Sequence, residues 1–218
     1  HLEKGSGRKP YGKDPMIALL SPAMNMQSQL PRHVEVSQPL FQAQADELAN
    51  LLAAYSPFEL EGLLRCNPQI ACRSYLYYQE YAIAEKRLSA LFAFDGLAYK
   101  NLDPWDFDDA DLAFAQGHMA ILSALYGILR PLDAISPYRL DFMGRFRVEG
   151  RNLYAYWGDK VCRALYERTD FAVNLASGEY EKLLRPHLQP KDRLVDCRFL
   201  VLRSGKSRNL ATEAQMAR

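Results

Sequence analysis

The chain has 218 residues, of which 49% are apolar, 11% aromatic and 24% charged. This length and composition can bury a substantial core without metal or disulfide cross-links, and they exclude an intrinsically disordered chain. No apolar run approaches the ~18–20 residues that a membrane-spanning helix needs, and no signal-peptide pattern opens the chain. We therefore expect a cytoplasmic protein with no membrane contact.

Residues 1–15 are rich in glycine, lysine and proline and precede an apolar run that begins at Met16. We interpret them as a vector-derived or flexible extension, and residues 16–218 as a single domain. The extension contributes +2 to the formal net charge of +1, so the remaining chain carries −1. Net charge therefore gives no support to nucleic-acid binding, which would require a local basic patch.

The first predicted elements are a strand and a helix. Residues 16–20 form a short apolar run that ends at a Ser-Pro pair, as a buried strand entering a loop would. Residues 40–54 carry apolar side chains at helical spacing, which indicates an amphipathic helix.

A pair of helices is predicted next. Ser56-Pro57 is typical of a helix start, with serine at the cap and proline in the first turn, and this helix should reach about Arg65. Asn67-Pro68 interrupts it, and a second helix should continue to about Lys86. The pattern predicts a helix, a tight turn and another helix.

The later elements alternate between strands and helices, which predicts a mixed α/β protein. Five aspartates occur within 103–111, where a solvated turn that caps the next helix is favoured over a metal loop, because no glycine lies where a calcium loop needs one. The expected elements are a strand at 88–94, a helix at 110–125, and short strands at 171–173 and 200–202.

Segment 122–140 contains Leu-Tyr-Gly-Ile-Leu-Arg-Pro-Leu-Asp and a later Pro-Tyr-Arg-Leu. Gly127 and Pro131 should end a helix, so that Arg130 and Arg139 emerge from loops. An arginine on a constrained loop suits bidentate capture of phosphate or carboxylate. The alternative for each arginine is an ion pair with a neighbouring aspartate that holds the loop together.

Two further segments are dense in aromatic and polar residues. The first, at 153–159, reads Leu-Tyr-Ala-Tyr-Trp-Gly-Asp. Its aromatic rings could line a pocket and stack on a flat ligand, or they could belong to the core. The predicted strand at 171–173 is followed by four polar or aromatic residues: Asn174, Ser177, Glu179 and Tyr180. Ligand groups often gather at strand ends in α/β folds, which favours a site here.

The cysteines form no Cys-x-x-Cys pair, and we interpret all four as structural thiols. Cys66 and Cys72 lie beside arginines, so they are the two to test as redox thiols. The sequence contains no nucleophile elbow, P-loop, dinucleotide fingerprint or zinc-protease helix. Neither a metal nor a cofactor is predicted.

Several rare motifs occur in a fixed order along the chain. They are Ser-Pro-Ala-Met at 21–24 and the segments 126–133, 137–140, 153–159 and 174–180. In these motifs the chain resembles the YaaA-like (DUF328/UPF0246) family of peroxide stress proteins, over essentially residues 16–218.

The resemblance implies a compact α/β fold with a helix-hairpin-helix-like element, DNA binding, and protection against hydrogen peroxide in the bacterial cytoplasm, linked to limiting free iron. The hairpin element would be the helix pair at 57–86, whose turn amides and helix N-terminus would face phosphates of duplex or bubble DNA. The expected phosphate contacts are Arg65, Arg73, Lys86 and Arg87.

The chain departs from the family pattern at several lysines. The resemblance predicts lysine where this chain has Met24, Gln69 and Asp95, and further lysines within 214–218. Each lost charge should weaken a grip on phosphate. The resemblance also predicts a further helix beyond Arg218, so we expect the C-terminal end to be missing.

Two functions are expected, the first implied by the resemblance and the second by the polar and aromatic segments. The first is DNA binding in peroxide stress protection. The second is an enzyme or ligand-binding protein for a nucleotide-like or other anionic small molecule, with Glu179 or Asp159 as the acid/base. The pocket of that second function would be built from Ser21, Arg130, Tyr138, Arg139, Trp157, Asn174, Ser177 and Tyr180.

Overall fold

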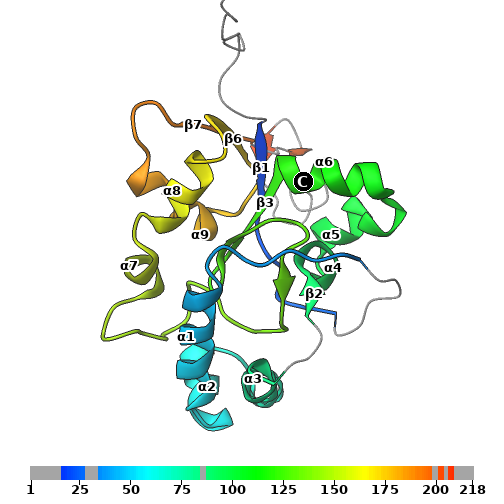
Figure 1. Cartoon of the computed structure of the whole chain (residues 1–218). Helices are drawn as coiled ribbons and strands as arrows, with labels where there is room; N and C mark the ends of the chain where they lie inside the picture. The colour runs from blue at the N-terminus through cyan, green and yellow to red at the C-terminus, as the bar shows by residue number, and fades with distance from the viewer. Residues whose placement is uncertain (1–15, 28–33, 84–86, 198–200, 204–205, 209–218) are drawn as a thin grey trace, which may run out of the picture.

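The computed structural model describes residues 16–27, 34–83, 87–197, 201–203 and 206–208. The described part is mixed α/β, with a five-stranded sheet in the order β4-β3-β1-β6-β7 (Figure 1). The strands of this sheet are β1 Ile17–Leu20, β3 Met119–Ser123, β4 Gly127–Leu129, β6 Phe171–Asn174 and β7 Arg193–Asp196. Two smaller antiparallel pairs are β2 Leu88–Ser89 with β5 Ala134–Ile135, and β8 Val201–Arg203 with β9 Lys206–Arg208.

Strand β1 lies at the centre of the sheet and is parallel to both of its neighbours. Leu19 lies opposite Ala120 of β3 and Asn174 of β6. Strand β4 alone runs antiparallel, against β3. The chain passes from β1 to β3 on one side and returns with β6 on the other, so the strand order reverses beside β1. In open α/β sheets, ligands bind outside the carboxyl ends of the strands at such a position.

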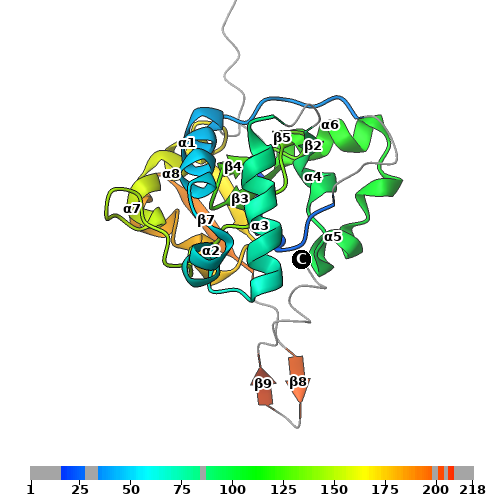
Figure 2. The same ribbon diagram turned by 90° about the horizontal axis from the view of Figure 1, so that it is seen from below.

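The helices group around the sheet in three sets: α1–α3, α4–α6 and α7–α9, which lie in different parts of the fold in Figures 1 and 2. The α-helices are α1 Gln42–Ala53, α2 Pro57–Leu64, α3 Pro68–Tyr81, α4 Ala90–Ala93, α5 Leu97–Leu102, α6 Asp109–His118, α7 Leu153–Trp157, α8 Lys160–Tyr166 and α9 Gly178–Glu181. Two 3₁₀ turns, η1 Pro104–Asp106 and η2 Arg185–His187, complete the described helical elements.

Helices α2 and α3 confirm the predicted pair and its start signals. Ser56 and Glu59 form a reciprocal capping box at the start of α2, and the Asn67 side chain accepts a hydrogen bond from the Ile70 N–H at 2.8 Å at the start of α3. Between them, Arg65 adopts a left-handed conformation with φ 52°. Such a conformation usually favours glycine, so here an arginine occupies the tight position of the turn. Helix α3 ends at Tyr81, before the predicted limit.

Two predicted elements were wrong in type. The strand expected over 88–94 ends at Ser89, and residues 90–93 form helix α4, with all four side chains buried. The helix expected over 110–125 ends at His118, and residues 119–123 form strand β3. Both stretches are apolar on every side, and such a pattern does not distinguish a buried strand from a buried helix.

Gly127 and Pro131 were predicted to end a helix, but residues 127–129 form strand β4 and Arg130 follows it in a loop. The remaining predicted elements are confirmed where the structure describes them. These are the strand at 16–20, the helix at 40–54, the capping turn before α6, and the strand at 171–173. Asp108 caps α6 in a reciprocal box with Asp111. The strand expected over 200–202 is observed at 201–203. The predicted extension, residues 1–15, lies outside the described residues.

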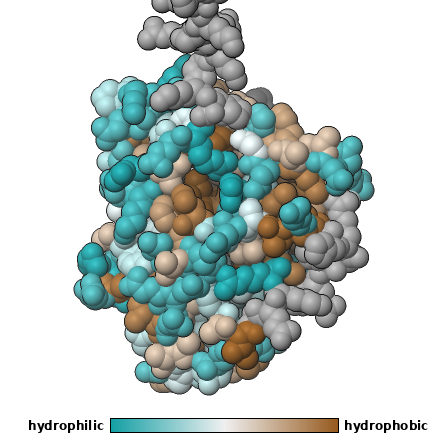
Figure 3. All heavy atoms as spheres, viewed as in Figure 1, coloured by the Kyte–Doolittle hydropathy of each residue, from teal (hydrophilic) through white to brown (hydrophobic). Residues whose placement is uncertain are grey.

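The core is continuous between the sheet and the helices, and its centre includes Leu19, Leu122, Tyr126 and Trp157, which are all fully buried. On the face drawn in Figure 3, apolar side chains form separate patches among hydrophilic ones. In the described residues, no helix combines the length and apolar character needed to cross a bilayer.

Candidate functional site

A cavity of about 360 Å³ lies where the chain leaves β1 and β6. Ser21 follows β1, and its hydroxyl accepts a hydrogen bond from the Ser177 N–H at 2.8 Å, beyond the end of β6. The Tyr99 hydroxyl donates to the Ser21 carbonyl at 2.8 Å from helix α5. The cavity therefore lies at the carboxyl edge of the two central parallel strands. Three of the predicted pocket residues line it, Ser21, Ser177 and Tyr180, together with Glu179, a predicted acid/base.

Glu179 reaches this cavity from the short helix α9. Its carboxylate accepts a hydrogen bond from the Phe142 N–H at 2.8 Å, which ties α9 to the 141–143 loop. Burial raises the pKa of the Glu179 carboxyl; the Phe142 N–H opposes this shift, and the charge of Asp141 adds to it. A carboxyl of raised pKa beside a cavity can hold or release a proton closer to neutral pH than a solvated glutamate.

The raised pKa of Glu179 predicts a pH-dependent effect of Glu179→Gln. The native state binds this proton more tightly than the unfolded chain, so the contribution of Glu179 to stability is fully present below the ordinary value of 4.5 and falls as pH rises through the raised pKa. Glutamine keeps an acceptor for the Phe142 N–H without the charge. We expect the variant to match the original protein at about pH 4 and to be at least as stable near pH 7, measured as the free energy of unfolding in urea. A free energy of unfolding of Glu179→Gln that falls further below that of the original protein as pH rises would contradict this account.

A second cavity of about 200 Å³ adjoins the first. Met24, Asn25 and Asp95 line both. The second cavity also contains Arg139, a predicted pocket residue, and Arg73, which was predicted to contact DNA. Neither arginine forms an ion pair with any described residue.

Met24 and Asp95 are two of the positions at which the resemblance predicts lysine. Both line these cavities, whereas Gln69 is exposed at the start of α3. The departures in charge at Met24 and Asp95 therefore alter the cavities rather than the outer face of the α2–α3 turn.

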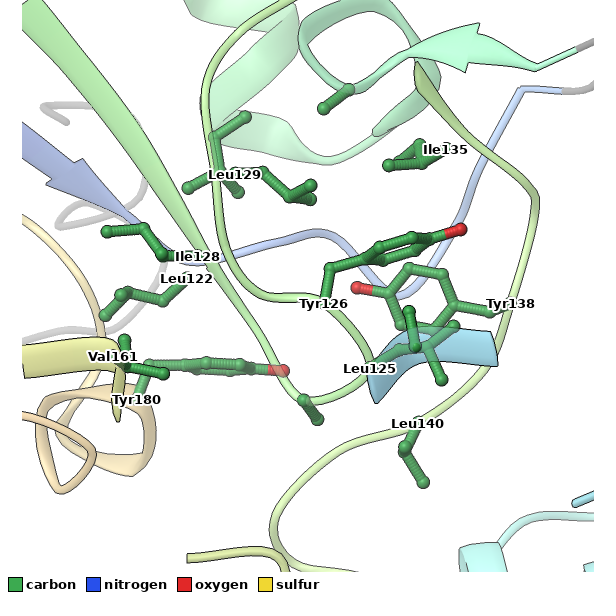
Figure 4. Packing of buried hydrophobic residues seen from close by; sticks show 14 of the residues in the cluster. Leu122, Leu125, Tyr126, Ile128, Leu129, Ile135, Tyr138, Leu140, Val161 and Tyr180 are labelled. Carbon is green, nitrogen blue, oxygen red and sulfur yellow. The ribbon is translucent and has the colours of Figure 1, made fainter. Parts of the chain in front are cut away.

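The structure places two of the predicted pocket aromatics in the core. Tyr138 is 4% exposed, packs beside Tyr126 (Figure 4), and shares a 2.8 Å hydrogen bond with the buried Ser123 hydroxyl. Trp157 is 0% exposed, and its indole N–H donates to the Ala124 carbonyl at 2.9 Å. Neither side chain lines the two cavities: Tyr138 is enclosed by Phe94, Tyr126 and Ser123, and Trp157 packs against Ala124 and Gly127.

Two predicted charged residues lie elsewhere. Arg130 is bound to Asp133, with its guanidinium NH2 at 2.9 Å from the carboxylate, so the alternative of an ion pair within the loop applies to it. Asp159 is exposed and lies 3.8 Å from Arg163 at the start of α8. Neither lines the two adjoining cavities: Asp159 lies at a separate cavity of about 530 Å³ beside α8, and Arg130 at another of about 360 Å³ that Asp133 and Arg168 also line.

Asn174, the remaining predicted pocket residue, is engaged at the end of β6. Its side-chain amide donates to Asp196 at 3.0 Å and to Glu181 at 3.2 Å, and its side-chain oxygen accepts from the Ala176 N–H. Arg185 also binds both of these carboxylates. This cluster holds β6, β7 and α9 together and so fixes the backbone that carries Ser177 and Glu179.

The residues predicted to contact DNA lie in different settings. Arg65 is exposed at the turn between α2 and α3, and Arg73 is exposed on α3. Arg87 is half-buried and lies over the Tyr81 ring at 5.5 Å, which gives it a structural contact. Lys86 lies outside the described residues.

Further residues join these sites without having been predicted. Arg145 is exposed, and its backbone N–H donates to the Leu63 carbonyl at 2.6 Å, which brings it beside the end of α2. Asn25 and Asp95 enter the cavities after strand-like apolar runs. Their only sequence signal was a polar residue just beyond such a run, which is too common to single out either position.

The cysteines give little support to a redox thiol. Burial raises the pKa of the Cys66 thiol, with Arg139 opposing the shift, so its reactive thiolate form is disfavoured. Cys72 and Cys197 are exposed, and Cys162 is buried with its pKa raised to about 11, chiefly by burial. Across the described ranges, no cluster of histidine, cysteine and acidic side chains could hold a metal ion.

The comparisons with known proteins agree with the motifs. A family model described as "Peroxide stress protein YaaA" matches residues 16–218. A UPF0246 protein of Lacticaseibacillus paracasei is 37% identical over 93% of this chain and 83% of its own length. UPF0246 proteins of Lactobacillus delbrueckii subsp. bulgaricus and Leptothrix cholodnii are 39% and 38% identical, each over 93% of this chain and 82% of their own length. The chain belongs to the YaaA family of peroxide stress proteins.

Proposed function

We propose that this protein acts in the bacterial cytoplasm in protection against hydrogen peroxide and binds DNA through the α2–turn–α3 element. The observation that carries the proposal is the group of unpaired arginines around the end of α2. Arg65 and Arg145 are exposed there, and neither forms an ion pair with a described residue. Arginines free of carboxylate partners are available to bind backbone phosphates.

The turn itself supports this role. The Ile70 N–H donates to the Asn67 side chain, and Pro68, the first residue of α3, has no N–H. These two positions therefore offer no free N–H to a phosphate, so the support from this turn is the positive end of the 14-residue helix dipole next to the exposed Arg65. We call the surface formed by Arg65, Arg145 and the start of α3 the α2–α3 surface. Because residues 16–218 carry a net charge of −1, DNA binding would depend on this local surface and not on the charge of the whole molecule.

The test is a titration of the protein into labelled duplex and bubble DNA, followed by fluorescence anisotropy at several salt concentrations. We expect micromolar or tighter binding that weakens steeply with salt. The double variant Arg65→Ala/Arg145→Ala should lower affinity and reduce the slope of log K against log salt by roughly 0.9 per lost phosphate contact.

The matched control is Arg163→Ala, which removes an exposed arginine of helix α8 that already pairs with Asp159. It should leave both the affinity and the salt slope unchanged. Binding that is absent, independent of salt, or equally reduced in both variants would reject the α2–α3 surface as the DNA-binding element.

A ligand-binding or enzymatic role is a second candidate, because the structure has two adjoining cavities at the carboxyl edge of β1 and β6. Of the two predicted acid/base residues, Glu179 lines one of them and Asp159 does not. In this second candidate, Glu179 is the acid/base and Arg139 binds an anionic part of the ligand.

A further inference from the structure

Arg139 is held in place by its backbone. Its carbonyl accepts a hydrogen bond from the Tyr78 hydroxyl of α3 at 2.5 Å, and the neighbouring Tyr138 N–H points to the Met26 sulfur at 3.4 Å. These contacts hold the 138–139 backbone beside the 200 Å³ cavity. We call this space, which Arg73 and Arg139 line, the arginine cavity. The Arg139 backbone is therefore held by the fold, and the residue lines the cavity without a carboxylate partner among the described residues.

The Arg139 Nε–H is fully buried and has no hydrogen-bond partner among the described residues. A buried charged donor without an acceptor is unfavourable, and native proteins usually satisfy such groups with protein, water or ligand. Arg73 reaches the same cavity from α3 and has no ion-pair partner in the described chain. Two arginines thus converge on one space without a carboxylate that neutralises either of them.

The other polar groups of the arginine cavity do not cancel this charge. Asp95 is the carboxylate that lines it, and Lys100 lies 3.1 Å from its Oδ1. The Ser74 hydroxyl donates to the Ile70 carbonyl at 2.7 Å, so its hydrogen is already used. The cavity therefore offers an excess of donors and positive charge, which is the setting that binds phosphate or carboxylate.

The volumes decide what kind of anion fits. A space of about 200 Å³ admits one anionic group with few attached atoms, and the adjoining 360 Å³ cavity admits the remainder of a small molecule. A phosphate of duplex DNA is a diester joined to sugars on both sides, so it does not enter a space of this size, whereas a terminal phosphate or a carboxylate does.

We propose that the two cavities form one binding site for a small molecule with a terminal phosphate or carboxylate. The anion lies between Arg73 and Arg139, and the uncharged body extends past Met24 and Asn25 toward Ser21 and Glu179. This inference rests on the second candidate function, and it names the ligand class and the residues that hold its charged end. Glu179, as an acceptor, selects a body that carries a hydroxyl or amino group.

The experiment uses the full chain, labelled with ¹⁵N at the arginine side chains, and follows the Nε–H signals during titration with inorganic phosphate and, in parallel, with acetate. We expect the Arg139 signal to shift and saturate with at least one of these two anions, with a dissociation constant in the low millimolar range or tighter. The anion that binds identifies the charged end as phosphate or carboxylate.

Variants make the assignment specific. Arg139→Met should weaken anion binding about tenfold or more, as measured by calorimetry. Arg139→Lys, which keeps a charge on the same backbone, serves as the second variant if Arg139→Met lowers the melting temperature, and it should retain part of the affinity. Arg163→Ala is the control and should bind the anion as the original protein does.

DNA anisotropy on the same samples separates this inference from the proposed DNA-binding function. Anion binding lost in Arg139→Met with DNA affinity unchanged supports a separate small-molecule site. No saturable shift at Arg139 with either anion overturns the inference, whatever the DNA result. Equal loss of DNA and anion binding in Arg139→Met also overturns it, because the cavity would then belong to the DNA-binding surface.

Discussion

Arg130→Met is expected to lower the free energy of unfolding by about 3–5 kcal/mol, because it leaves a buried carboxylate without its positive partner. The Asp133 side chain is 1% exposed. It accepts hydrogen bonds from the Arg130 backbone N–H at 2.7 Å, from the Arg130 guanidinium at 2.9 and 3.0 Å, and from the Ser37 hydroxyl at 2.7 Å. Methionine keeps the aliphatic volume of arginine but removes the guanidinium that faces this carboxylate.

The surrounding contacts make the position difficult to repair. Gln116 donates to the Ser37 hydroxyl at 3.0 Å and accepts from the Leu132 N–H at 2.8 Å, so the 130–133 loop, the segment around Ser37 and helix α6 share one hydrogen-bond network. Urea unfolding measures the effect. The double variant Arg130→Met/Asp133→Asn should recover part of the loss, because no charge remains buried.

Arg163→Met is the matched control for this prediction. Arg163 also faces an aspartate, but at 3.8 Å and with both side chains more than half exposed. Exposed pairs of this kind contribute about 0–1 kcal/mol, so the control should be close to neutral. A loss below about 1 kcal/mol in Arg130→Met would mean that the arginine is not needed to balance Asp133, and would reopen a ligand-binding role for it.

Local signals in the sequence were sufficient to predict where three of the described helices, α2, α3 and α6, begin. Ser56, Asn67 and Asp108 each cap the helix that follows, because a cap depends only on a side chain and an amide two or three residues ahead. The type of element at 90–93 and 119–123 was not predictable in this way. Residues 90–93 and 120–123 are all buried, so their conformation is set by which strand or loop they contact, and the sequence shows no periodicity that would indicate it.

The candidate site was predictable in part for a related reason. Ser21, Ser177 and Glu179 follow two strands that are adjacent and parallel in the structure, so strand ends alone brought them together. Arg73 and Arg139 meet only because α3 packs against the segment after β5, a contact between residues far apart in sequence. Rare aromatic motifs were less informative about the site, because rings such as Tyr138 and Trp157 are buried and form part of the core.

Gly127→Ala tests that packing directly, and we expect it to lower the free energy of unfolding by roughly 2–5 kcal/mol. Gly127 has φ +70°, and a Cβ at this position would lie 2.8 Å from Cζ3 of Trp157 and 3.1 Å from a ring carbon of Phe41. Trp157 is fully buried and fixed by its hydrogen bond to Ala124, so it cannot move aside freely. The left-handed backbone contributes about 1–2 kcal/mol and the steric overlap about 1–3 kcal/mol.

A double-mutant cycle with Trp157→Phe separates these two causes. Phenylalanine is a smaller ring, so in that background Gly127→Ala should cost less: the backbone share of about 1–2 kcal/mol and the smaller overlap with Phe41 that remains. Gly62→Ala is the matched control. Gly62 lies within α2, and a Cβ added there would meet nothing within 4 Å. Alanine at this position should therefore stabilise the protein by about 0.5–1 kcal/mol. Equal costs of Gly127→Ala in the two backgrounds would show that overlap with the indole contributes nothing to the loss of stability, and would contradict the steric share of this prediction.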